Sequence, residues 1–338
     1  MDIFTEVYST LIDMLKSKSL DSSWADVEAG LKALCEVAGP NEAKSTSLQS
    51  LRDKLRIGAK ADGKGDRKLA VAEAILKAAQ TGNSGFQKRA ALIKTLKHFY
   101  FVAKKGNQCV WVVDHPKSYS AWAFDHLDGQ TEQELKSLLQ KENEVFGRSR
   151  RNMMSDSLQL ARKWSMDIMV KMGNADAPSL AVVKRWFHTS DASEQQVKAT
   201  AAILLSGYKK ISDACNSTTI IFSDRPHKRA SGDWDNTFAS VNSGDAIPVI
   251  YIFQAFLDAG KRNKSGNIPK LWLCALTVVH ELSHKLAGTK DKSYDYQGLK
   301  PGGNISVADA LINADSWAYF CADLVGALTQ ATISDVMK

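Results

Sequence analysis

Apolar residues in the first hundred positions recur at spacings of three and four, the spacing of one buried helix face. The two clearest runs are Phe4, Val7, Leu11, Met14 and Trp24, Val27, Leu31, Leu34. Glycine-containing stretches at 60–67 and 82–85 lack this periodicity and are typical of loops. The pattern breaks again at 147–152, so we place a domain boundary near residue 150. Residues 1–150 are predicted to form a mainly helical N-terminal domain, which could serve targeting, export or regulation.

The second half of the chain, residues 151–338, mixes long helical patterns with short β-prone segments. Helical spacing covers 155–172, a short stretch ending near His188, 193–214, 270–287 and 307–328. Residues rich in β-branched and aromatic side chains cover 218–222, 237–241 and 248–253. This order predicts an α+β, mostly helical domain with a small antiparallel sheet.

The helix predicted over 270–287 carries the motif His280-Glu281-Leu282-Ser283-His284. One helical turn separates the two histidines, so both imidazoles project from the same face and can bind one zinc ion. Glu281 stands beside the first histidine and can act as general base toward a metal-bound water. Two His and a Glu on an apolar helix would be costly to bury without partners. The pattern therefore favours a catalytic zinc site.

A catalytic zinc normally takes three protein ligands and keeps one position for water. No His and no Glu follows His284 in the sequence, which leaves aspartate as the third ligand on that side. Gly288 is expected to end the motif helix, and Asp291 follows within one short turn. We therefore expect Asp291 to be the third ligand. The other residues that could take this place are Asp295, Asp315, His188 and His227.

The residues after the motif helix carry a family resemblance. Gly288-Thr289-Lys290-Asp291 and Tyr294 resemble the G-T-x-D-x-x-Y pattern of the aspzincins, the family of deuterolysin and the lysine-specific metalloendopeptidases. The segment 313–320 (NADSWAYF) is similar to N-A-D-x-x-x-Y-F of the lysine-specific branch, and Trp186-Phe187 resembles a W-F pair in the same relatives. The resemblance covers about residues 155–330 and implies a zincin-like catalytic domain built around the HExxH helix.

The resemblance also implies a role for each matching residue. His280, His284 and Asp291 would hold one catalytic zinc ion. Glu281 would be the general base that deprotonates the zinc-bound water, and Tyr294 would donate a hydrogen bond to the tetrahedral oxyanion. These roles amount to a zinc-dependent endopeptidase that hydrolyses peptide bonds with a metal-activated water.

Two further regions are expected to meet the substrate. Asp315 would either line the pocket for the residue after the scissile bond or hydrogen-bond a zinc-bound histidine. The strand over 248–253, which includes Tyr251, would form the edge of the cleft and pair with an extended peptide. The sequence departs from the lysine-specific enzymes where Ala318 replaces an acid and Asp295 replaces a glycine. Selectivity for lysine is therefore not predicted.

The charge of the chain suggests an alternative function. The 338 residues carry a net charge of +7, and the segment from Arg52 to Lys105 alone holds 14 basic against 4 acidic residues. A non-catalytic zinc-containing protein could use this segment to hold an anionic partner. Nucleic acid is not the expected partner, because no aromatic-interleaved or zinc-finger pattern accompanies the charge.

The cysteines and the N-terminus bear on where the protein acts. The five cysteines are widely spaced, so no disulfide framework is predicted. The acidic start lacks a classical signal peptide, and no apolar run approaches the roughly 18 residues that span a bilayer. We expect synthesis in the cytoplasm and export by a specialised secretion system, as a toxin or effector. The expected partners are a protein or peptide substrate, the secretion machinery and a cognate inhibitor.

Overall fold

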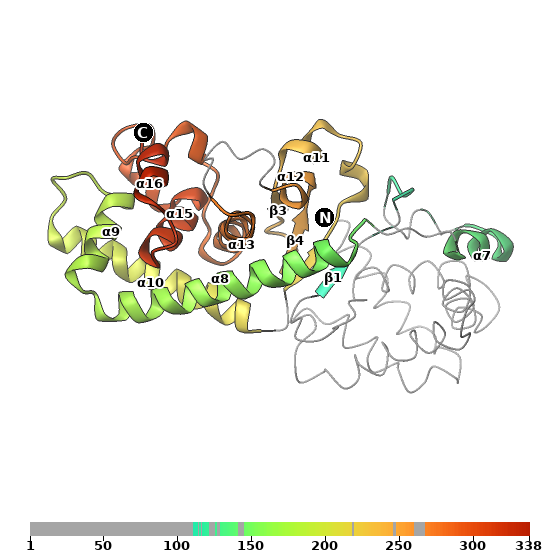
Figure 1. The fold of residues 1–338 in the computed structure, drawn as a ribbon, viewed down its shortest axis with the longest axis horizontal. Helices are drawn as coiled ribbons and strands as arrows, with labels where there is room; N and C mark the ends of the chain where they lie inside the picture. Colours follow the sequence, from blue (N-terminus) through green and yellow to red (C-terminus); the bar gives the residue numbers. More distant parts are fainter. Residues whose placement is uncertain are drawn as a thin grey trace. The chain divides into compact units, whose positions relative to one another are not determined.

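The computed structural model describes residues 111–113, 115, 117–121, 126, 129–140, 145–217, 220–245, 248–259 and 268–338 (Figure 1). The helices expected before residue 105 and the basic segment Arg52 to Lys105 lie outside these residues. The chain forms two compact units. The first contains Met1–Arg151, Thr218–Asp235 and Gly244–Ile252, and the second contains Asn152–Ser217, Asn236–Ser243 and Phe253–Lys338. The chain passes from the first unit to the second after Arg151, and two later segments belong to the first unit again.

Three strands of the first unit pair in parallel. They are β1 (Trp111–Val113), β2 (Ile221–Ser223) and β4 (Val249–Ile252), with Trp111 opposite Ile221 and Ile221 opposite Val249. The antiparallel arrangement expected from the sequence is wrong for these pairs. Parallel strands need long crossover connections, and more than a hundred residues separate β1 from β2. The other elements are α7 (Glu132–Gln140), η3 (Pro226–Lys228) and α11 (Gly232–Asn236).

The second unit is mostly helical, as the sequence predicts. Its long helices are α8 (Arg148–Asn174), which begins in the first unit, α9 (Ala177–Phe187), α10 (Glu194–Asn216), α13 (Lys270–Ala287) and α15 (Ala314–Leu324). The short elements are β3 (Ala239–Val241), α12 (Gln254–Leu257), η4 (Asp295–Gln297), α14 (Val307–Leu311) and α16 (Gln330–Val336). No helix of the described residues is long and apolar enough to span a membrane.

The single helix expected over 307–328 is two helices, α14 and α15, with a break at Ile312 and Asn313. The break has a clear cause in backbone hydrogen bonding. The Ile312 carbonyl accepts a hydrogen bond from Lys290 N at 2.7 Å, and Ala314 N donates to the Lys290 carbonyl at 3.0 Å. Backbone groups that pair with another segment cannot also continue a helix. Because of this interruption, the backbone between α14 and α15 can hold the chain that follows α13.

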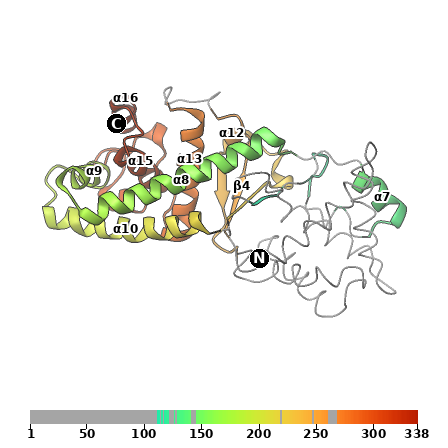
Figure 2. The same ribbon diagram turned by 60° about the horizontal axis from the view of Figure 1, so that its bottom comes forward.

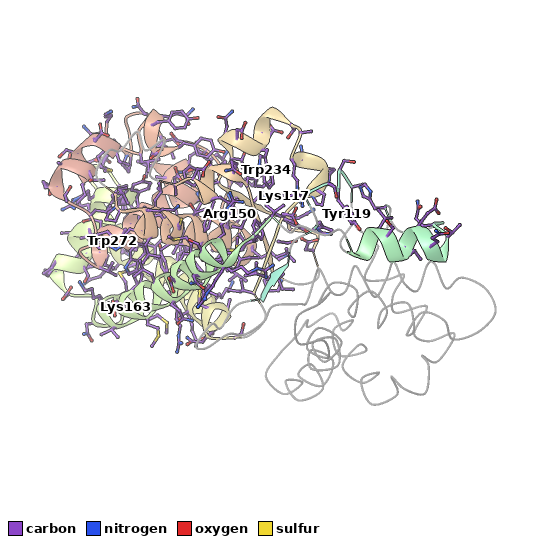
Figure 3. The ribbon with its side chains drawn as sticks, turned by 45° about the vertical axis from the view of Figure 1, so that its right-hand side comes forward. Lys117, Tyr119, Arg150, Lys163, Trp234 and Trp272 are labelled. Atoms are coloured by element: carbon purple, nitrogen blue, oxygen red, sulfur yellow. The ribbon has the colours of Figure 1, made fainter. Side chains whose placement is uncertain are left out.

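Helix α13 is held by aromatic packing within this unit. It packs against α10 and α15, and Figures 1 and 2 show the long helix α8 passing near it. Trp164 of α8 meets Trp272 of α13 edge to face, with ring centroids 6.3 Å apart (Trp272 is labelled in Figure 3). On α10, Tyr208 stacks on Trp317 of α15 at 5.3 Å and donates its hydroxyl to the Trp317 carbonyl at 2.5 Å. These contacts fix the helices that surround the motif.

The three cysteines in the described residues are free and buried. Burial raises the pKa of Cys215 and of Cys274 to about 12, and it raises the pKa of Cys321 well above its usual value. Thiols of this kind stay protonated and unreactive at neutral pH. They serve as small apolar side chains of the core.

Candidate metal centre

The motif histidines project from one face of α13. The opposite side of the helix is fixed in the core by fully buried residues, among them Cys274, Val278 and Leu282. His280 and His284 lie one turn apart, with their ring planes at 86° and their Nε2 atoms 3.0 Å from one another. The two imidazoles therefore offer two nitrogen donors to the same point in space.

The end of α13 fixes the orientation of the second histidine, His284. Gly288 takes the left-handed conformation (φ 73°), which residues with a side chain rarely adopt, and its N–H donates to the Ser283 carbonyl. The chain reverses, and the Thr289 carbonyl comes to lie 2.8 Å from Nδ1 of His284. Because that carbonyl accepts the Nδ1 proton, Nε2 is left as the free donor atom.

Asp291 completes a triangle of ligand atoms. Its Oδ1 atom lies 3.1 Å from His280 Nε2 and 3.2 Å from His284 Nε2. Donors of a tetrahedral zinc with bonds of about 2.0–2.1 Å are separated by about 3.3 Å. The observed separations match this value closely, and two imidazoles with one carboxylate form a known zinc donor set. Among the described residues, these three are the group suited to a metal ion.

The charges at the triangle are strongly coupled. Burial lowers the pKa of His280, but hydrogen bonds to Asp291 and Asp315 outweigh it and raise that pKa well above its usual value. The pKa of His284 is likewise raised, chiefly by Asp291 against the effect of burial. Although burial opposes the change, both histidines hold the pKa of Asp291 well below its usual range. A divalent cation bound here would replace protons shared within this cluster.

Asp315, at the start of α15, accepts a hydrogen bond from Nδ1 of His280, the ring nitrogen that is not part of the triangle. Its Oδ1 lies 2.6 Å from His280 Nδ1, and its Oδ2 accepts the Asp295 N–H at 2.9 Å. Of the two roles expected for this residue, the geometry corresponds to a hydrogen bond with His280, a candidate ligand. A carboxylate in this position fixes the ring and its tautomer and makes Nε2 a better donor.

The Glu281 side chain is almost fully buried, with 4% of its surface exposed. Burial raises the pKa of its carboxyl, although the neighbouring His280 and His284 oppose that change. The Val241 N–H of β3 donates a hydrogen bond to this carboxylate. A carboxylate whose pKa is shifted toward neutrality is suited to accept and return a proton.

Strand β3 is the strand that contacts α13 within the second unit. In addition to the bond from Val241, Lys285 Nζ donates to the carbonyls of Asn242 at 3.0 Å and Ser243 at 3.1 Å. These contacts were not foreseen from the sequence, because a lysine directly after the motif does not indicate its partner. The lysine fixes the end of the strand to the motif helix.

Strand β4, which was expected to form the cleft edge, belongs to the first unit. Its Tyr251 is fully buried, its hydroxyl donates to Asp245 at 2.9 Å, and the Arg225 guanidinium lies 4.1 Å from its ring centroid. A substrate contact by Tyr251 stays a prediction.

Tyr294 lies directly before η4, with 38% of its surface exposed. Its hydroxyl interacts with the Asp291 carboxylate. Partial burial, together with the negative charges of Asp291 and Asp315, raises the pKa of Tyr294 to about 12. The phenol therefore keeps its proton and remains a hydrogen-bond donor at neutral pH.

The other residues considered as ligands are engaged elsewhere. Asp295 accepts hydrogen bonds from the Tyr319 hydroxyl and its neighbour's backbone, each at 2.7 Å. His188, after α9, lies 2.9 Å from the Thr200 hydroxyl, and His227 belongs to the first unit. The structure brings Asp291, and none of these, to the two histidines of α13.

A family model described as lysine-specific metallo-endopeptidase, the aspzincins, matches residues 172–322. This match confirms the family resemblance in the C-terminal part of the chain. It spans the Trp186-Phe187 pair, the motif helix and the residues around the triangle, including Asp315. No curated protein matches the chain. The family consists of zinc metallo-endopeptidases, which act on proteins and peptides.

Proposed function

We propose that the second unit is a zinc-dependent endopeptidase that uses one catalytic ion and a metal-activated water. The observation that carries this proposal is the triangle of His280, His284 and Asp291 ligand atoms, with edges of 3.0–3.2 Å, next to a buried glutamate. The family match over residues 172–322 supports the same chemistry.

Each residue around the triangle has a separate role in the proposed hydrolysis. Zinc held by His280, His284 and Asp291 would supply Lewis acidity, which would acidify a water molecule and polarise the scissile carbonyl. Glu281 would accept a proton from the attacking water and deliver it to the leaving amine. Tyr294 donates its phenol proton in a hydrogen bond to the oxyanion as the tetrahedral intermediate forms. Asp315 and the Thr289 carbonyl keep His280 and His284 in the orientation that presents Nε2.

Purified full-length protein tests the proposal directly. We expect one zinc per chain and cleavage of casein or of a peptide library. Glu281→Gln should keep the zinc and the fold while losing at least about a hundredfold in rate, because the proton acceptor is gone. A wild-type protein that carries zinc and cleaves no peptide would contradict the enzyme proposal and favour a non-catalytic zinc protein.

We further propose that the peptidase acts as an exported toxin or effector, delivered by a specialised secretion system and neutralised by a cognate inhibitor. The family match begins at residue 172, so a long N-terminal part lies outside it and is available for targeting or export. Expression in a bacterial host should be toxic for the wild type and harmless for Glu281→Gln. Equal growth with both proteins would contradict a toxic activity in that host.

A further inference from the structure

Two tyrosine rings lie one over the other beside the metal ligands. The rings of Tyr294 and Tyr296 are stacked with centroids 5.7 Å apart and planes at 9°. They are 38% and 57% exposed, so the pair stands at the surface of the site. Large aromatic surface left in water is unfavourable, and offset stacking recovers part of that cost.

The backbone beneath the rings is tightly fixed. Gln297 Oε1 accepts the Tyr294 N–H at 2.8 Å, and the Tyr294 carbonyl accepts the Gln297 N–H at 2.9 Å. The Asp295 N–H donates to Asp315 at 2.9 Å, and the Tyr296 N–H donates to the Asp295 carboxylate at 2.7 Å. The backbone of residues 294–297 is therefore fixed to the start of α15, and both tyrosine rings are attached to this fixed backbone.

The Tyr294 side chain has less support than its backbone. Its ring stacks on Tyr296, and its hydroxyl interacts with Asp291, which contributes to the raised pKa of the phenol. In the proposed reaction this hydroxyl donates to the developing oxyanion. The ring stack is then the contact that can hold the phenol in place.

We infer that Tyr296 is a positioning residue that holds the Tyr294 phenol in the orientation needed to donate to the oxyanion. The inference rests on the proposed function, because it assigns Tyr296 a role through Tyr294. The family pattern around Asp291 and Tyr294 ends before position 296, and so the resemblance gives this residue no role.

A contact between Tyr296 and a substrate side chain is the competing explanation for an exposed aromatic residue here. The two explanations differ in kinetics. A residue that binds substrate equally in the ground and transition states changes KM, whereas a residue that orients an oxyanion donor changes kcat.

The test is a double-mutant cycle on the zinc-loaded full-length protein. Tyr296→Ala should lower kcat by about three- to tenfold, the range that a lost aromatic stack allows. KM should stay within about twofold, and zinc content should not change. Tyr296→Phe keeps the ring and should retain wild-type kcat. In the Tyr294→Phe background, which lacks the hydroxyl, Tyr296→Ala should have no further effect on kcat.

Val170→Ala is the matched control, because Val170 is an exposed apolar side chain of α8 (68%) without a place in the site. It should leave kcat and KM unchanged. An equal fall in kcat from Tyr296→Ala in both Tyr294 backgrounds would overturn the inference. A rise in KM alone would overturn it in favour of a substrate contact.

A second measurement is independent of catalysis. In protein labelled with ¹³C-tyrosine, the Tyr294 ring signals are identified by their loss in Tyr294→Phe. Tyr296→Ala should shift them downfield, since the ring current of the partner is removed, and Tyr296→Phe should not. Unshifted signals would overturn the inference. If the wild type cleaves no peptide, the proposed function fails, and the NMR result still decides whether Tyr296 orients Tyr294.

Discussion

A single oxygen atom of Asp291 connects the two motif histidines. Oδ1 lies 3.1 Å from His280 and 3.2 Å from His284, and the pKa of Asp291 is held well below its usual range by both of them against burial. The carboxylate is thus ionised over the whole physiological range and ready to bind a cation. Its position depends on the turn at Gly288 and on the backbone pairing of Lys290 with residues 312 and 314.

Asp291→Ala is expected to lose zinc, because one of three protein ligands disappears. The affinity for zinc, measured by competition with a chromogenic chelator, should fall by more than about a hundredfold. Lys292→Ala is a suitable control, since Lys292 is a neighbour that pairs with Asp309 rather than with the ligands. Full retention of zinc by Asp291→Ala would remove Asp291 from the ligand set.

Asp315→Asn is expected to have a smaller effect than loss of a ligand. The amide keeps the size of the side chain but weakens the 2.6 Å contact with His280 Nδ1. Partners of ligand histidines typically contribute about 10- to 100-fold to metal affinity or activity. Zinc affinity and kcat should therefore fall within that range. A variant with wild-type zinc affinity that changes only the preference for the residue after the scissile bond would instead place Asp315 in the substrate pocket.

At this scale the sequence predicts the candidate ligands, but it predicts only part of what supports them. The spacing of His280, Glu281 and His284 follows from helix geometry, and Asp291 follows from the glycine that ends the helix. The hydrogen bond that Asp315 accepts from His280 Nδ1 was one of two roles implied by the family resemblance, and it depends on how α15 packs beside α13, which no local pattern encodes. The same holds for Lys285 and its two carbonyl partners after β3.

At the scale of elements, the helix boundaries follow the apolar spacing where one face is buried. The helix predicted over 270–287 is observed as Lys270–Ala287, and that predicted over 193–214 is observed as Glu194–Asn216. The prediction fails at 307–328, because the apolar spacing continues across a break made by backbone pairing with Lys290. The predicted antiparallel direction of the strands is wrong for a similar reason. Residue patterns give the existence of a strand and not its partner.

Gly207 in α10 offers a prediction in which two effects oppose one another. Replacing a helical glycine by alanine normally stabilises a helix by up to about 1 kcal/mol. Here the added methyl would overlap the Trp317 ring of α15. Overpacking a core costs about 1–3 kcal/mol. Gly207→Ala should therefore lower the free energy of unfolding, measured by urea denaturation.

Gly173 of α8 is the matched control, because a methyl group there would meet nothing within 4 Å. Gly173→Ala should leave the free energy of unfolding unchanged or raise it slightly. Greater stability in Gly207→Ala would mean that α10 and α15 pack less closely than the structure describes.

At the scale of the whole molecule, the two compact units share the chain in an interleaved way. Thr218–Asp235 and Gly244–Ile252 belong to the first unit, although they lie between segments of the second. The sequence predicts one domain boundary near residue 150 and a single domain over residues 151–338. Parallel pairing of β2 with β1, and of β4 with β2, places these two segments in the first unit. His280, His284 and Asp291, the proposed zinc ligands, all lie within the second unit, so metal binding should stabilise that unit.

Zinc at the proposed site would compete with protons for the two imidazoles, which would make this stabilisation depend on pH. In the zinc-free protein, the raised pKa values of His280 and His284 stabilise the fold through their pairing with Asp291. This contribution is complete below the unfolded-state pKa of about 6.5 and is lost as the pH rises through the raised values. Zinc requires both imidazoles without the proton on Nε2. Stabilisation by zinc should therefore increase as the pH rises.

Thermal unfolding of zinc-loaded and chelator-treated protein measures this effect. At a fixed free zinc concentration about a thousandfold above the Kd at pH 8, zinc should add about 4 kcal/mol at that pH, and the difference in Tm should be larger near pH 8 than near pH 5.5. Glu281→Gln keeps the three ligands and should keep the difference, whereas Asp291→Ala should lose it. A zinc-dependent rise in Tm that is the same at both pH values would mean that the ion binds somewhere other than these histidines. Because the measurement needs no substrate, it tests the site separately from the proposed peptidase activity.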